Sequence, residues 1–279
     1  MTESSIVVRR MEFDYSPDME LVFIDSDPNN SALFLGTWFL LPYLEPYLMK
    51  TMRQALDQVT DPKLQREMKQ FCSQEGQHYR QHAKANEVIL AQCPDGKAKQ
   101  ALLEAIAEVK AEYLDFSENK SLAYNLAYAE GFEAYTCAGA RIQLEQRMFD
   151  HMIDPIRDLM LWHIMEEVEH RTVAFDAYEH LVGKYFYRVL VGLQAQKHFI
   201  GWGVKLAGLL KECLPEVFGR DYSSDEIKRR NKRNVRFVKA MIPSWLNTYS
   251  PFYSPHKVSL PAMYEEARQH YTNTAAKTA

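Results

Sequence analysis

The 279-residue sequence has little cysteine and no arrangement of it that suggests crosslinking. Its four cysteines are Cys72, Cys93, Cys137 and Cys213, and none forms a Cys-x-x-Cys pair. A closely spaced disulfide framework of the secreted kind is therefore excluded, and reduced thiols favour a cytoplasmic protein. The N-terminal segment lacks an apolar core followed by a cleavage site, so we expect no signal peptide.

Long apolar runs and a strong net charge are also missing. No apolar run reaches the ~18 to 20 residues that span a bilayer, and the best candidate, residues 33–44, contains Pro42. A net charge of −4 gives no electrostatic case for nucleic acid as a partner. The basic run at residues 228–236 is interpreted as a solvated helix face, with contact to an anion or a membrane surface as the alternative.

No β-rich pattern is present, and helical periodicity predicts an all-α fold built on a four-helix bundle with additional C-terminal helices. We divide one overall domain into an arm or cap at residues 1–30, a helical bundle at 31–183 and a C-terminal helical extension at 184–279. The bundle helices are expected at about 30–59, 62–92, 97–117, 117–149 and 155–183. The first should begin at Asn30 or Ser31 and kink near Glu45, because Pro42 and Pro46 flank that residue.

The apolar segment 185–214 predicts a further helix packed on the bundle, with a lid or a helix lying on a membrane surface as alternatives. A basic helix should follow at about 224–241, and then an ordered loop from Pro243 to Pro261.

Two Glu-x-x-His pairs carry the chemistry: Glu75 with His78, and Glu167 with His170. On an α-helix, offsets of three and four residues place side chains on one face. In carboxylate-bridged two-metal bundles, two helices each supply such a pair and two others each supply a single Glu. Glu45 precedes the first pair by 30 residues and Glu133 precedes the second by 34, each on an otherwise apolar stripe. The sequence therefore predicts that four antiparallel helices bring these six side chains together.

This ligand set has a physical logic. Four carboxylates balance the charge of two divalent cations, so a buried site can be nearly neutral. A mixed carboxylate and imidazole set favours iron or manganese over zinc. His163 lies one turn before Glu167 and is a further candidate ligand. His82 and Glu130 are candidate groups behind the ligands, and Glu130 is also an alternative to Glu133. Glu166 and Glu169 are expected to face solvent.

The motifs QEGQHYRQH, EGFEAY and WHIMEEVEHRTVAFDAYEHL resemble the bacterial family named "predicted metal-dependent hydrolase", within the ferritin-like superfamily. The resemblance covers roughly residues 10–260 and implies a ferritin-like bundle with a metal site. The block from His163 to His170 is also similar to the diiron arylamine N-oxygenases. That similarity implies seven ligands: Glu45, Glu75, His78, Glu133, His163, Glu167 and His170. Pro46, directly after Glu45, departs from the pattern.

Three functions remain open at this stage. The first is a non-haem diiron oxygenase or oxidase that uses two Fe ions, or Mn, and O2 as co-substrate to oxidise a small apolar or amine-containing organic molecule. The second is a metal-dependent hydrolase with a hydroxide bridging two metals. The third is a non-catalytic iron-binding protein. The partners that fit these functions are an electron-donor protein and a second copy of the chain in a homodimer. Peripheral contact with a membrane is a further alternative.

Overall fold

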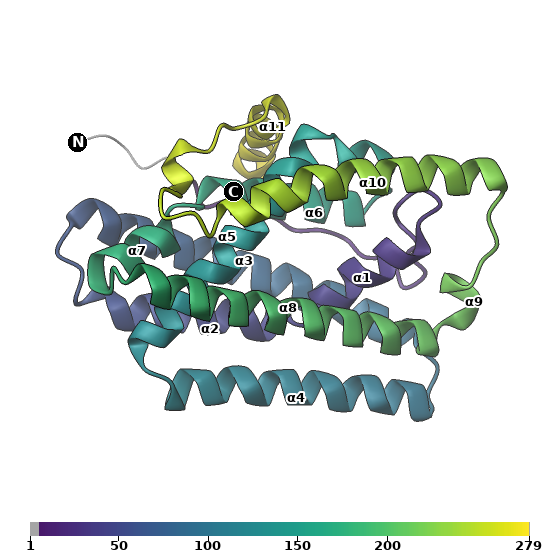
Figure 1. Ribbon diagram of the computed structural model, residues 1–279. Coiled ribbons are helices and arrows are strands. Elements are labelled where there is room, and N and C mark those ends of the chain that lie inside the picture. The colour runs from purple at the N-terminus through teal and green to yellow at the C-terminus, as the bar shows by residue number, and fades with distance from the viewer. Residues whose placement is uncertain (1–5, 279) are drawn as a thin grey trace.

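The computed structural model describes residues 6–278, and all regular structure in this part of the chain is helical (Figure 1). The first five residues of the predicted arm, 1–5, lie outside the described residues. Extended backbone pairs at one isolated bridge, between Ile24 and Met152. The helices, in chain order, are α1 Pro28–Trp38, α2 Leu41–Leu56, α3 Pro62–Gln92, α4 Lys97–Asn119, α5 Leu122–Glu145, η1 Met148–His151, α6 Ile156–Glu169, α7 Val173–Leu181, α8 Tyr185–Cys213, α9 Pro215–Phe218, α10 Ser224–Asn247, η2 Pro255–Lys257 and α11 Ala262–Thr278.

Side-chain caps set where several helices begin. Asp61 caps α3 as predicted, because its carboxylate accepts from the Lys63 backbone N–H. The predicted caps of two other helices were wrong: Asp27 caps α1 and Ser121 caps α5. Pro28 in the first turn of α1 explains the earlier start, since its missing N–H would have had no helical partner there.

The break in the first predicted helix lies earlier than expected. The helix is interrupted at Phe39 and Leu40, and α2 then starts at Leu41 with Pro42 in its first turn. Pro46 lies inside α2 near its start, where it removes a single intrahelical hydrogen bond. Glu45 consequently sits within a continuous helix and not at a break. In the same way, α10 continues through Pro243, which was assigned to a loop.

A second break was not anticipated. The predicted continuous helix over 155–183 is two helices, and α6 ends at Glu169 with His170 as its C-cap residue. His170 has φ −96° and ψ 9°, outside helical geometry. Neither proline nor glycine marks this position in the sequence. The break directs the His170 side chain toward α3.

The helices that carry the predicted ligands pack against one another. Helix α2 packs on α3 and α5, and α6 packs on α5 and α3. Helix α8 crosses α5 and also covers α1 and α4. Gly131 of α5 meets Gly192 of α8 at this crossing, where a β-carbon added to Gly131 would lie 2.2 Å from the Gly192 α-carbon. Of the helices in residues 6–278, none combines the length and apolar character needed to cross a bilayer.

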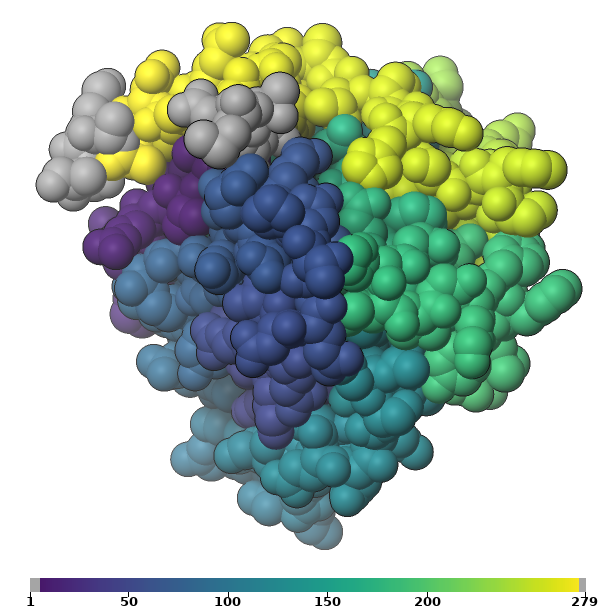
Figure 2. Space-filling view, turned by 90° about the vertical axis from the view of Figure 1, so that its left-hand side faces the viewer, coloured from purple at the N-terminus to yellow at the C-terminus, as the bar shows by residue number. Residues whose placement is uncertain are grey.

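The segment before α1 runs along α3 without regular structure of its own. Four glutamine side chains of α3 hold it: Gln70, Gln74, Gln81 and Gln92 donate to the backbone carbonyls of Ile6, Val7, Met11 and Met19. In the space-filling view this purple segment lies against the blue helices and below the yellow C-terminal residues (Figure 2). It thereby closes one side of the helical core.

Candidate metal centre

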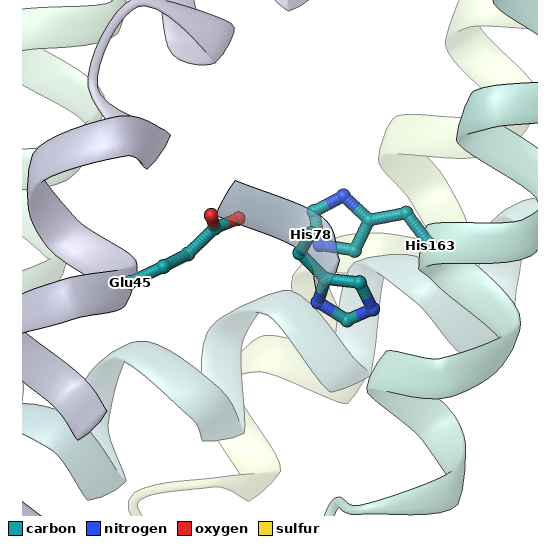
Figure 3. A group of neighbouring side chains, drawn as sticks. All are labelled: Glu45, His78 and His163. Carbon is teal, nitrogen blue, oxygen red and sulfur yellow. The ribbon is translucent and has the colours of Figure 1, made fainter. Parts of the chain in front are cut away.

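The seven side chains implied as ligands come together inside the helices. Glu45 comes from α2, Glu75 and His78 from α3, Glu133 from α5, His163 and Glu167 from α6, and His170 from the residue after α6. Two groups could each hold an ion: Glu45 with His78 and His163, and Glu75 with Glu167 and His170. Within each group the candidate ligand atoms lie within 4.8 Å of one another. Figure 3 shows the Glu45 carboxylate facing the rings of His78 and His163.

Two carboxylates lie between the histidines of the two groups. The Glu75 Oε1 atom is 3.4 Å from His170 Nε2 and 3.6 Å from His78 Nδ1. The Glu167 Oε1 atom is 2.9 Å from His163 Nε2, 3.6 Å from His170 Nε2 and 3.9 Å from His78 Nδ1. Glu133 Oε2 lies 3.3 Å from His170 Nε2. Glu75 and Glu167 are therefore placed where a carboxylate could bridge two cations.

The cluster is buried, and many of its polar atoms have no hydrogen-bond partner. Six of the seven side chains belong to residues that are 3% exposed or less, and the His163 side chain is 12% exposed. Buried polar atoms in proteins almost always have a partner. Here eight lack one: both carboxylate oxygens of Glu45 and of Glu133, Glu75 Oε1, Glu167 Oε2, His78 Nδ1 and His170 Nε2.

A second set of buried side chains fixes the histidine rings from behind. Glu166 Oε2 lies 3.1 Å from His78 Nε2, and Gln74 Oε1 lies 3.0 Å from His170 Nδ1. A carboxylate can only accept there, so His78 carries a proton on Nε2, and Nδ1 is the nitrogen that faces the cluster. The amide oxygen of Gln74 likewise leaves His170 Nε2 free. Such outer partners orient metal-binding imidazoles.

Arg9 joins the two outer partners. Its guanidinium contacts Glu166 and Glu169, each at 2.9 Å, and Glu169 accepts from Gln74 at 2.6 Å. The prediction that Glu166 and Glu169 face solvent was therefore wrong, since they are 0% and 2% exposed. The N-terminal segment covers this side of α6, and no periodicity in the sequence reveals it. Arg9 and Gln74 were missed for that reason.

The two further candidates behind the ligands have different surroundings. His82 Nε2 lies 2.6 Å from His163 Nδ1, so it contacts a candidate ligand directly. Glu130 instead accepts from Arg188 at 2.8 Å. Arg188 also lies over the ring of Phe175. Glu130 is thus held by α8, whereas both carboxylate oxygens of Glu133 remain without partners inside the cluster.

Burial and crowding shift the acid–base properties of the cluster in opposite directions. Burial, reinforced by the neighbouring Glu167, raises the pKa of Glu133 to about 8. Burial and the carboxylates of Glu75 and Glu167 hold the pKa of Glu45 well above its usual range. Burial alone would lower the pKa of His78, but the hydrogen bond to Glu166 and the nearby carboxylate of Glu75 raise it to about 9. Burial would also raise the pKa of Glu167, but its hydrogen bonds with His163 and His170 hold that pKa well below its usual range.

Comparison with known protein families gives one match. Residues 7–259 match the family described as "Predicted metal-dependent hydrolase". The chain belongs to this family. The match spans every helix that contributes to the cluster. No curated protein and no solved structure matched the chain significantly.

Membership of the predicted metal-dependent hydrolase family and the buried histidine and glutamate groups both imply metal ions. The donor set consists of imidazole nitrogen and carboxylate oxygen, which suits iron, manganese or zinc better than a soft, thiolate-binding metal. The free thiol of Cys137 lies one turn after Glu133, but burial raises its pKa to about 12 and keeps it protonated.

Proposed function

We propose that this protein is an enzyme with a two-metal centre, and that the centre activates dioxygen to oxidise a small organic molecule. The proposed ligands are Glu45, Glu75, His78, Glu133, His163, Glu167 and His170, with two Fe ions, or Mn, between them. We propose further that α2, α3, α5 and α6 form a ferritin-like four-helix bundle around these ions.

The observation that carries the proposal is the set of eight unpartnered buried atoms described above. Each buried polar atom without a partner costs about 1–3 kcal/mol, and more for a charged group. All eight belong to the proposed ligands. Two divalent cations would satisfy them together and balance four carboxylates. The residues present therefore fit the metal pair.

The protein side chains have separable roles around such a pair. Bound iron would supply the electrons that reduce dioxygen. Glu75 and Glu167 lie between the histidines of the two groups and would bind the ions through their carboxylates. Glu166 keeps the proton of His78 on Nε2, so that Nδ1 stays available as a ligand. Gln74 fixes the His170 ring in the same way.

The surroundings of the cluster favour a small reactant and an apolar substrate. The His78 ring packs edge-on against Trp162 at a centroid distance of 4.9 Å, and the His170 ring against Phe71 at 4.7 Å. His82 packs against Trp38 at 5.0 Å. Aromatic walls exclude water from reactive ions. Dioxygen and a small apolar or amine-containing molecule suit this enclosure better than a bulky polar ester.

Oxygen uptake tests the proposal directly. The purified protein would be loaded with Fe(II) without air and then mixed with O2 in an oxygen electrode and a rapid-scanning spectrophotometer. We expect O2 consumption in proportion to the iron pairs and a transient absorption band in the near-ultraviolet or visible range. Iron that binds at the site and consumes no O2 would rule out this function.

Hydrolysis is the second candidate, and the description of the family favours it. In that reaction the two ions would generate a hydroxide nucleophile at neutral pH. Turnover of ester or amide substrates with zinc or manganese in the absence of O2 would support hydrolysis.

A further inference from the structure

The outer surface of α8 carries large apolar side chains in exposed positions. They follow helical spacing and line one face of the helix: Phe186, Leu190, Leu193, Ile200 and Val204. Phe186 is 84% exposed and Val204 is 56% exposed. A surface helix of a globular protein normally turns its apolar stripe inward. The stripe on α8 is instead additional to an inward apolar face that packs on α1, α4 and α5.

Helix α10 also exposes an apolar stripe to solvent. None of its side chains is fully buried, and its outward stripe consists of Val235, Val238, Ile242 and Leu246, which are 46–56% exposed. The inward side is the polar one in the first half of the helix, where Arg230, Arg233 and Asn234 bond to residues 25–27. These contacts hold the helix with its apolar stripe outward.

The C-terminal half of α10 contacts α8 through side chains. Gln196 of α8 accepts from the Trp245 indole of α10 at 2.6 Å and also from the Tyr249 hydroxyl. Figure 1 shows α8 and α10 running antiparallel across the front of the molecule. On each helix the exposed stripe flanks the side that makes these contacts. Phe252, 83% exposed, follows α10 in a loop that the Arg188 side chain ties to α8. We call the nine stripe residues and Phe252 the α8–α10 face.

Positive charge surrounds this face. Helix α10 contains seven basic and two acidic residues, in a chain whose net charge is −4. Four exposed cations next to its apolar stripe make no ion pair within residues 6–278. They are Arg229, Lys232, Arg236 and Lys239. Lys197, exposed within the α8 stripe, also makes none in that range. Cations without an ion pair therefore lie beside the apolar side chains that this face exposes.

We propose that the α8–α10 face binds peripherally to an anionic lipid surface. Apolar side chains would enter the boundary between headgroups and acyl chains, and the flanking lysine and arginine residues would contact the anionic headgroups. Phe186 and Phe252 are the most exposed and would enter deepest. A second copy of the chain fits the face less well, because a symmetric contact would place the same cations opposite one another.

Vesicle flotation with the full-length protein tests this proposal. Vesicles of phosphatidylcholine alone would be compared with vesicles that contain an equal share of phosphatidylglycerol. We expect the protein to float with the anionic vesicles and to dissociate in high salt. The triple variant Lys232→Glu, Arg236→Glu, Lys239→Glu should weaken binding by about a hundredfold or more, at about fivefold for each cation lost. The double variant Phe186→Ser, Phe252→Ser should weaken it at least tenfold.

Matched substitutions on α4 provide the control. Leu114 is 50% exposed and Lys110 is exposed, and both lie outside the α8–α10 face. Leu114→Ser with Lys110→Glu should leave flotation unchanged, and circular dichroism should show folded protein for every variant. The proposal is overturned if the wild-type protein stays with neither vesicle, or if the α4 control weakens flotation as much as the variants of the face. A dimer in gel filtration that the Phe variant converts to monomer, without vesicle binding, would identify the occupant as a second copy.

Discussion

Glu133 shows what a buried carboxylate does at the scale of a single residue. Both of its oxygens lack hydrogen bonds, and burial with the charge of Glu167 raises its pKa to about 8. A raised acid pKa means that this group favours the folded state most below its unfolded pKa near 4.5, and that this contribution is lost as the pH rises through about 8. At neutral pH the metal-free protein therefore carries a cost at Glu133.

Replacing this residue should separate metal binding from stability. We predict that Glu133→Gln reduces bound metal in elemental analysis, yet stabilises the metal-free protein at pH 7 by about 1–3 kcal/mol, because no buried acid has to be kept protonated. Thermal unfolding after chelation measures the second effect. Glu87→Gln, at an exposed position of the same helix as Glu75, is the control and should change neither quantity. A Glu133→Gln protein with full metal content would remove Glu133 from the ligand set.

Arg9 is the residue on which the outer hydrogen bonds depend. It is 1% exposed and neutralises Glu166 and Glu169, which in turn orient His78 and, through Gln74, His170. Removing one partner of a buried ion pair leaves an uncompensated charge and costs about 3–5 kcal/mol. We predict that Arg9→Met destabilises the protein by that amount in denaturant unfolding and weakens metal binding about 10–100-fold.

The neighbouring Arg10 provides a matched control, because it is exposed. Arg10→Met should leave both stability and metal affinity within error of the wild type. An Arg9→Met protein that binds metal as tightly as the wild type would show that the outer network does not position the histidines.

At the scale of elements, the crossing of α5 and α8 depends on two glycines. A β-carbon on Gly131 would overlap the Gly192 backbone at 2.2 Å, so any side chain there must push the helices apart. We predict that Gly131→Ala destabilises the protein by about 3 kcal/mol or more in denaturant unfolding. Gly201→Ala, at an α8 position with nothing within 4 Å, should instead stabilise by about 0.5–1 kcal/mol. Equal effects of the two substitutions would contradict this account of the crossing.

Some helices and site residues could be predicted from the sequence, and others could not. Asp61 with Pro62 and the apolar stripe that follows were sufficient to predict α3, and the spacing of the two Glu-x-x-His pairs predicted the residues that converge. The break at His170 could not be predicted, because its cause is tertiary: the ring is held by Gln74 and faces Glu133. The contacts of Arg9 depend on an irregular segment packing on helices far along the chain. Periodicity carries no information about such contacts.

At the scale of the whole molecule, metal binding should be coupled to proton release. The pKa of Glu133 is raised to about 8 and that of His78 to about 9, so both hold protons at neutral pH in the metal-free protein. Cations must displace these protons. We predict that Mn(II) affinity rises between about pH 6 and pH 8, by about tenfold per pH unit for each proton displaced.

Isothermal titration calorimetry in buffers with different ionisation enthalpies measures the number of protons released. A pH-independent affinity without proton release would mean that these two side chains do not bind the metal. Because the site groups come from helices far apart in the chain, metal should also raise the thermal midpoint, and more so at higher pH.

We propose that a pair of cations binds among helices α2, α3, α5 and α6, with His170 just after α6 as one of the ligands. Anomalous scattering at the iron edge, from crystals of protein loaded with Fe(II), tests it most directly. We predict two peaks per chain, roughly 3.5–4 Å apart, one near Glu45, His78 and His163 and the other near Glu75, Glu167 and His170. Iron peaks only elsewhere on the chain, or no iron bound at this cluster, would contradict it.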